Sequence, residues 1–176
     1  MQFTETRLPG AYLIDPEPIE DERGYFVTDW TRAELEARHL NAGLIQGNLS
    51  YNAKRGTLRG LHFQVAPYAE VKLVRCLRGA LWDVIVDLRP DSPTFKQWTP
   101  VELSAANRRL LYVPEGFAHG YVTLEDHTEV MYLVSQYYHP EAARGLRWDD
   151  PAFGIPWPIP PACISARDRA HPLFEK

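Results

Sequence analysis

The residues best suited to catalysis are basic side chains that stand among apolar residues in the sequence. The segment 55–64 reads Arg-Gly-Thr-Leu-Arg-Gly-Leu-His-Phe-Gln and contains Arg59 and His62, and Lys72 follows within the segment 70–76. Cations among leucine, phenylalanine and valine indicate a pocket for an anionic ligand. Histidine ionises near neutral pH, so His62 could take a proton from a substrate while a neighbouring cation holds the remaining negative charge. A core histidine with unrelated surface cations is the alternative explanation.

Two predicted strands carry side chains that could read a polar ligand. In the segment 44–50, Gln46 and Asn48 alternate onto one face. In the predicted strand 128–138, Tyr132 and Tyr138 share a face and would lie about 20 Å apart along a regular strand, which is the reach of an extended ligand. The alternatives are a solvated polar face and ordinary half-buried tyrosines.

The elements that must position these residues are predicted to be mainly short strands. Fifteen prolines and eleven glycines are dispersed along the chain, a punctuation typical of β-sandwiches and closed barrels. The segment 80–88 alternates, with an apolar face opposite Asp83 and Asp87, and so predicts a half-buried strand.

Only one helix is predicted, over residues 31–38. Thr31 can cap it, Glu34 can complete a capping box, and Trp30 and Leu35 can form the hydrophobic staple.

The remaining candidates lie in or beside turns. Arg23 follows a turn and is either solvated or offered to an anion. A tight turn at 114–116 places His119 at the start of a returning strand. The proline-rich segment 151–161 cannot be regular structure and should wrap the surface, leading to Arg167 and Asp168.

Bulk properties limit the classes of function. A length of 176 residues indicates one domain, spanning 1–176. A net charge of -4 and a pI of about 5.9 provide no general basic surface for nucleic acid. Two cysteines indicate a reducing, cytoplasmic setting. No signal peptide is predicted, and no apolar run approaches ~18 residues, so no membrane association is predicted.

A metal site is suggested by one motif and opposed by the ligand count. The pattern Pro114-x-Gly116-x-x-His119 resembles half of a cupin metal motif. The other half normally contributes two closely spaced histidines and a carboxylate, whereas Gln64 follows His62 and the sequence has no His-x-His. Fewer than three plausible ligands make a tight site improbable, so we expect neither a metal nor another cofactor.

Along nearly its whole length the chain resembles the dTDP-4-dehydrorhamnose 3,5-epimerase family, which consists of RmlC-like cupins. Eight motifs in order carry the resemblance: Asp21-Glu-Arg-Gly, Leu58-Arg-Gly-Leu-His-Phe-Gln, Lys72-Leu-Val-Arg-Cys, Val86-Asp-Leu-Arg, Asp91-Ser-Pro-Thr, Pro114-Glu-Gly-Phe-Ala-His-Gly, Tyr137-Tyr-x-Pro and Ser165-Ala-Arg-Asp. The resemblance implies an all-β fold, a cupin-type jelly-roll sandwich or barrel with a few short helices. It also implies a metal-free homodimer whose N-terminal segments are exchanged.

The resemblance further implies roles for twelve residues. In proton transfer, His62 would be the base, Asp168 its orienting carboxylate, Lys72 the cation beside the developing enolate and Tyr132 the acid on the opposite sugar face. The implied contacts to a nucleotide-sugar substrate are Arg23 of the partner subunit, Phe26, Gln46, Asn48, Arg59, His119, Tyr138 and Arg167. Among these, Arg59 and Arg23 would meet the diphosphate, and Tyr138 would stack on thymine.

The expected function is therefore inversion of C3 and C5 in a nucleotide-linked 4-keto-6-deoxyhexose, most simply dTDP-4-dehydro-6-deoxy-D-glucose. Thr28, Gly47 and Ala143 depart from residues common in the family. These departures leave open inversion at C3 alone or action on another nucleotide-linked hexulose. From other classes, a non-catalytic carbohydrate-binding jelly roll and a metal cupin remain alternatives.

Overall fold

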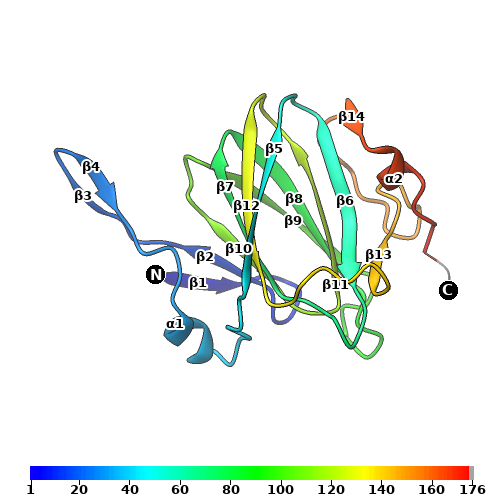
Figure 1. Cartoon of the computed structure of the whole chain (residues 1–176), viewed down its shortest axis with the longest axis horizontal. Coiled ribbons are helices and arrows are strands. Elements are labelled where there is room, and N and C mark those ends of the chain that lie inside the picture. Colours follow the sequence, from blue (N-terminus) through cyan, green and yellow to red (C-terminus); the bar gives the residue numbers. More distant parts are fainter. Residues whose placement is uncertain (175–176) are drawn as a thin grey trace.

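Two β-sheets packed face to face form the body of the protein in the computed structural model, which describes residues 1–174 (Figure 1). The strands are β1 (Gln2–Glu5), β2 (Tyr12–Asp15), β3 (Ile19–Asp21), β4 (Gly24–Phe26), β5 (Gln46–Asn52), β6 (Thr57–Gln64), β7 (Lys72–Arg78), β8 (Ala80–Asp87), β9 (Trp98–Ser104), β10 (Leu110–Val113), β11 (Phe117–Thr123), β12 (Thr128–Val134), β13 (Ala143–Gly145) and β14 (Cys163–Ile164). The helices are α1 (Arg32–Glu36) and α2 (Ala166–Arg169). The expected all-β, cupin-type class with a few short helices is confirmed.

The two sheets contain different strands, and the core lies between them. One has the order β1-β2-β10-β7-β12-β5, and the other has β13-β6-β11-β8-β9 with β14 paired to β6. The main apolar core lies between them, since Val74 and Val130 of the first sheet cluster with Ile85 and Leu103 of the second. None of the helices in the described residues is long and apolar enough to cross a bilayer.

Strand β8 alternates as expected, but the prediction that it is half buried was wrong. Asp83 and Asp87 are both 0% exposed, and the apolar face on the other side is buried as well. The reason is a further apolar layer over the outer face of the second sheet. There the proline-rich segment packs the Trp157 ring 5.5 Å from that of Trp82, and the Trp98 indole donates a hydrogen bond of 2.8 Å to the Phe153 carbonyl.

Helix α1 is shorter than predicted. The Thr31 hydroxyl caps it by accepting the Glu34 amide at 3.2 Å, as expected. The Glu34 carboxylate instead bonds Arg38 at 2.6 Å, and the helix ends at Glu36. Leu35 is fully buried, and Trp30 packs against the same cluster.

Two other strand boundaries also differ from the predictions. Strand β12 ends at Val134 instead of running to Tyr138. Its two antiparallel partners offer no strand residue beyond this point, because Val134 is paired with Gln46, where β5 begins, and with Lys72, where β7 begins. Strand β11 already begins at Phe117, so His119 lies within the strand and not at its start.

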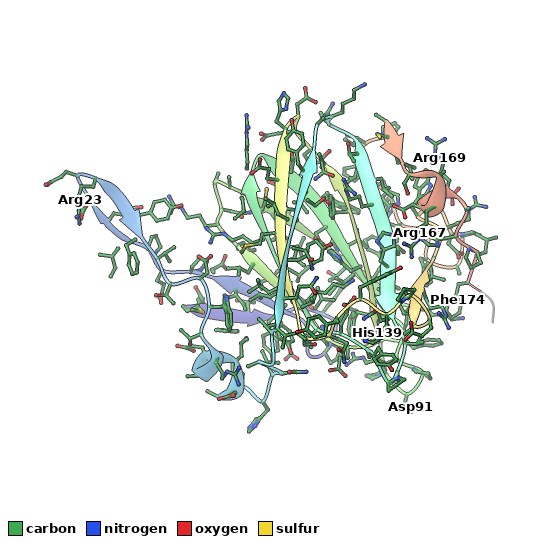
Figure 2. All side chains as sticks on the ribbon, in the orientation of Figure 1. Arg23, Asp91, His139, Arg167, Arg169 and Phe174 are labelled. Carbon is green, nitrogen blue, oxygen red and sulfur yellow. The ribbon has the colours of Figure 1, made fainter. Side chains whose placement is uncertain are left out.

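The β3–β4 hairpin projects away from the sandwich (Figure 1). Its apolar side chains are uncovered, with Ile19 73% and Phe26 71% exposed. Arg23 lies near the tip (Figure 2).

Candidate active site

A cavity of about 400 Å³ brings together most of the candidate residues from both sheets. Nine of the twelve line it: Gln46, Asn48, Arg59, His62, Lys72, His119, Tyr132, Tyr138 and Arg167. Gln46 and Asn48 share the inner face of β5, as the alternation predicted, and the amide of Gln46 donates a 2.7 Å hydrogen bond to Asn48. Tyr132 and Tyr138 also line one cavity although β12 stops between them.

Strand β6 places His62 at the centre of this arrangement. In the pairing register His62 lies opposite His119 of β11 on one side and Gly145 of β13 on the other. Strand β6 belongs to one sheet and β12, which carries Tyr132, belongs to the other. His62 and Tyr132 therefore approach the cavity from opposite sheets.

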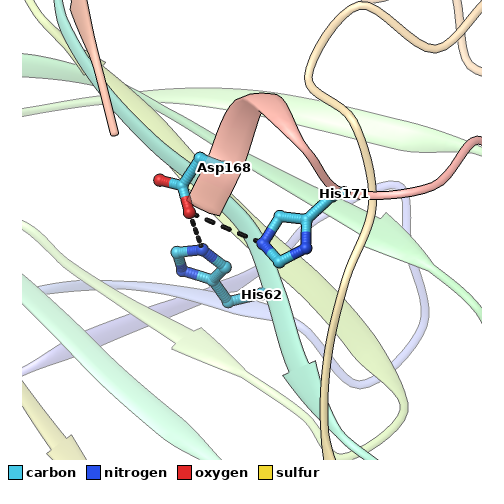
Figure 3. Close-up of side chains that lie close together, drawn as sticks. All are labelled: His62, Asp168 and His171. Carbon is cyan, nitrogen blue, oxygen red and sulfur yellow. Dashed lines mark hydrogen bonds and ion pairs between the residues drawn. The ribbon is translucent and has the colours of Figure 1, made fainter. Parts of the chain in front are cut away.

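Asp168 orients His62 from behind the cavity. It lies in α2, whose first turn is capped by the Ser165 hydroxyl accepting the Asp168 amide at 3.0 Å. Its carboxylate lies 2.7 Å from His62 Nε2 and accepts the Gly60 amide at 3.4 Å (Figure 3). Burial alone would raise the Asp168 pKa, but the hydrogen bond and charge of His62 lower it below its usual value. An ionised Asp168 keeps the proton on Nε2, which leaves the lone pair of Nδ1 as the basic atom of His62.

Lys72 supplies a buried cation beside His62. Its Nζ donates to the His62 carbonyl at 3.2 Å and lies 3.2 Å from a carboxylate oxygen of Glu70. Glu70 lines the cavity as well and was not among the predicted site residues. Its only sequence signal is its place two residues before Lys72, on the same side of an extended segment.

Tyr132 is held in its protonated form. Burial, and next the negative charge of Glu70, raise the pKa of its phenol. A neutral phenol facing the cavity is able to donate a proton.

His119 is paired with a buried carboxylate that sequence reasoning placed on an exposed face. Its Nε2 lies 2.9 Å from Asp83 Oδ2, and both side chains are buried. Burial raises the Asp83 pKa, against the opposing effects of His119 and Lys72. The alternation of β8 already placed Asp83 on the face opposite the apolar one. Only the packing of the two sheets shows that the face carrying Asp83 points into the sandwich.

Arginine side chains form the cationic part of the cavity, and Tyr138 lies beside one of them. Arg59 donates to the Asn52 side chain at 2.8 Å, and Arg167 donates to the Tyr138 hydroxyl at 3.3 Å. Arg144, which was not predicted, lines the same cavity. Arginine side chains suit a phosphate because their forked donors match its oxygens.

Two predicted contacts lie away from this cavity. Arg23 pairs with Asp21 on the exposed β3–β4 hairpin, and Phe26 lies on the same hairpin (Figure 2). Neither lines the cavity of its own chain. Of the departures noted in the sequence, Ala143 lines the cavity and Gly47 lies on the exposed face of β5.

The ligand count used against a metal site was incomplete. His62, Asp168 and His171 place three ligand atoms within 4.8 Å of one another (Figure 3). His171 was overlooked because it lies in a C-terminal segment without a recognisable metal spacing.

Nearly the whole chain is similar to proteins of one known family. The family model for dTDP-4-dehydrorhamnose 3,5-epimerase matches residues 5–176. The chain is 45% identical to the dTDP-4-dehydrorhamnose 3,5-epimerase of Sinorhizobium fredii, covering 98% of this chain and 89% of that protein.

Two solved structures are similar along nearly the whole chain. The dTDP-4-dehydrorhamnose 3,5-epimerase of Bacillus anthracis with TDP and PPi bound superposes with a TM-score of 0.95 at 46% identity, covering 98% of this chain and 99% of that one. A 3'-monoepimerase from Streptomyces bikiniensis in complex with dTDP-quinovose has a TM-score of 0.88 at 30% identity, covering 96% of this chain and 85% of that one.

Proposed function

The chain belongs to the dTDP-4-dehydrorhamnose 3,5-epimerase family, and we propose that His62 and Tyr132 carry out its epimerisation on opposite faces of one sugar ring. The enzyme is an isomerase that takes a dTDP-linked hexulose as substrate. The proposed reaction converts dTDP-4-dehydro-6-deoxy-D-glucose to dTDP-4-dehydro-L-rhamnose. The observation that carries the residue roles is the oriented His62–Asp168 pair facing a neutral Tyr132 across the cavity.

The first half of the reaction breaks a carbon–hydrogen bond. The ketone at C4 makes the hydrogens on C3 and C5 acidic, and His62 Nδ1 accepts the proton. The electron pair moves onto the C4 oxygen as an enolate. The buried Lys72 ammonium stabilises that charge, and the ionised Asp168 stabilises the imidazolium.

The second half returns a proton from the other face. The Tyr132 hydroxyl gives its proton to the carbon, which inverts the centre, and the phenolate regains a proton from solvent. His62 releases its proton to solvent as well, so each inversion exchanges one hydrogen with water. Neither step consumes another reactant.

The nucleotide end of the substrate would occupy the cationic part of the cavity. We propose that Arg59 and Arg167 bind the diphosphate, that Tyr138 stacks on thymine, and that Gln46, Asn48 and His119 are polar contacts. The bound TDP in the Bacillus anthracis relative supports this arrangement.

We further propose that the chain is one domain that works as a homodimer in the cytoplasm. The exposed hairpin residues Arg23 and Phe26 would reach the cavity of the partner subunit. Cys76 and Cys163 are both unpaired thiols, in keeping with a reducing compartment.

Incubation with dTDP-4-keto-6-deoxyglucose in deuterated water tests the function, with NMR reading the label at each carbon. Deuterium at C3 and C5 with inverted stereochemistry is expected. Deuterium at C3 alone would favour the narrower 3-epimerase activity, for which the monoepimerase neighbour is the specific support. Saturable binding without any exchange would instead indicate a non-catalytic carbohydrate-binding protein.

A further inference from the structure

A second imidazole lies behind the catalytic base and has no role in the proposed reaction. His171 follows α2 and places its Nε2 3.5 Å from Asp168 Oδ1, the oxygen that His62 Nε2 approaches to 2.7 Å (Figure 3). The rings of His62 and His171 meet edge to face with centroids 5.5 Å apart. One carboxylate oxygen thus lies between two imidazole nitrogens.

The His171 nitrogen is buried without a hydrogen bond. The side chain is 11% exposed, and its Nε2 has no hydrogen-bond partner among residues 1–174. A buried polar atom left unpaired costs free energy, so it points to a ligand or a function that satisfies it.

We infer that His62, Asp168 and His171 bind a divalent transition-metal ion such as Zn²⁺, and that this ion inhibits the epimerase. Nitrogen and carboxylate ligands lie about 2.0–2.2 Å from zinc, so neighbouring ligand atoms around one ion are roughly 3 Å apart. The two observed separations, 2.7 Å and 3.5 Å, bracket that spacing. The largest separation in the cluster is within 4.8 Å, so binding requires the His171 ring to move toward the other two ligand atoms.

The ligand types select the class of ion. Two imidazoles and one carboxylate suit Zn²⁺, Co²⁺ or Ni²⁺, whereas Mg²⁺ and Ca²⁺ prefer oxygen ligands. Three protein ligands leave a coordination position for water.

Gly145 makes room for the third ligand. A Cβ at this position would lie 2.2 Å from His171 Nε2, so any larger residue at position 145 would displace the ring. The same glycine is paired with His62 in the sheet, which brings the His171 ring to the base.

Inhibition follows from which nitrogen the metal occupies. A metal on His62 Nε2 forces the ring proton onto Nδ1, the atom that otherwise accepts the proton of the sugar. The ion also takes the Asp168 oxygen that stabilises the imidazolium. Binding of the ion is independent of the proposed function, but inhibition depends on it.

Calorimetric titration of metal-free enzyme with ZnCl₂ tests the binding. The wild type should bind one Zn²⁺ per chain, and MgCl₂ should give no saturable heat. His171→Ala removes a ligand, and Gly145→Ala keeps all three ligands but displaces the His171 ring; each should weaken Zn²⁺ binding at least ~10-fold. The control His127→Asn removes an exposed histidine on the β11–β12 turn, where asparagine tolerates the left-handed backbone, and should bind as the wild type does.

Spectra and rates complete the test. Co²⁺ should give visible d–d absorption with the wild type and lose it in His171→Ala, while circular dichroism checks that each variant is folded. In wild type, epimerisation should fall with Zn²⁺ occupancy and recover with a chelator. No saturable Zn²⁺ binding by the wild type, or equal affinity in His171→Ala, would overturn the site. Tight binding without inhibition would leave the site standing and contradict the role of His62 Nδ1.

Discussion

The proposed base and acid must each have the right protonation state before the substrate arrives, and neighbouring groups set the pKa values of Asp168 and Tyr132. Burial raises the pKa of Asp168, but the hydrogen bond and charge of His62, together with the Gly60 amide and the charge of His171, lower it below its usual value, so Asp168 stays ionised. Tyr132 stays neutral because burial and the charge of Glu70 raise its pKa. The proposed inversion needs a lone pair on His62 at one side of the cavity and a proton on Tyr132 at the other.

Replacing the base tests the first of these roles. His62→Asn should reduce exchange of substrate hydrogen with deuterated water by ~10²–10⁴-fold, because a positioned general base is lost. Binding of dTDP should be nearly unchanged in calorimetry, since the proposed diphosphate contacts are arginines elsewhere in the cavity. Exchange at the wild-type rate would show that another group is the base.

Removing the phenol tests the second role. Tyr132→Phe keeps the ring but deletes the proton donor on the far face, so inversion should fail. His62 and Lys72 can still form the enolate, and the proton can return from the same side. In deuterated water the variant should label its substrate at a reduced rate without inverting it. Inversion at the wild-type rate would assign the donor to a different residue.

At the scale of elements, β8 contributes one carboxylate that pairs with a cavity residue and a second carboxylate that stabilises the fold. Its Asp83 pairs with His119 in the cavity, and its Asp87 anchors the loop that follows the strand. Asp87 accepts hydrogen bonds of 2.7 Å from Arg89, 2.6 Å from Ser92 and 2.7 Å from Thr94. Burial would raise the Asp87 pKa, but these bonds lower it to about 2.

Asp87→Asn should destabilise the fold by about 2 kcal/mol, because charged hydrogen bonds within a buried network are lost. The lowered pKa also sets a pH dependence: the contribution of Asp87 is complete above its ordinary pKa of 3.8 and disappears as pH falls toward about 2. Urea unfolding across this range should show a smaller pH slope in the variant. The control Asp91→Asn alters an exposed carboxylate nearby and should change neither quantity; a matching loss there would contradict the assignment.

At the scale of the whole molecule, the hairpin β3–β4 projects from the sandwich with apolar side chains that the single chain leaves uncovered. It stands away from the two sheets and exposes Ile19 and Phe26 (Figure 1). Exposed apolar side chains on a projecting element are typical of an interface. A second copy that receives this hairpin would bury them and gain Arg23 beside its own cavity.

Light scattering should therefore show a dimer, and two inactive variants should complement each other. In a mixed dimer of His62→Asn and Arg23→Ala, one cavity carries both changes and the other carries neither. After co-refolding, random pairing should restore about a quarter of the wild-type sites. Absence of complementation between folded dimers would show that Arg23 does not act across the interface, and a fully active monomer would contradict the dimer itself.

The sequence alone determined which residues share a face and which segment carries the chemistry. Period-two alternation predicted the joint face of Gln46 and Asn48 and the opposition of Asp83 to the apolar side of β8, because neighbouring side chains in a strand point in opposite directions. Eight ordered motifs indicated the family and contain His62, Lys72, His119 and Arg167 of the cavity. These are local properties of the chain.

The tertiary structure decided which faces are buried and which distant residues meet. Both faces of β8 are covered because a second sheet and the proline-rich segment pack against it. Strand β12 stops where its pairing partners stop. Asp168 lies 106 residues from His62 in the chain, and the overlooked His171 joins them only because α2 docks beside β6 and Gly145 leaves space for its ring. Such contacts depend on how the sheets close, and no spacing within the sequence encodes that geometry.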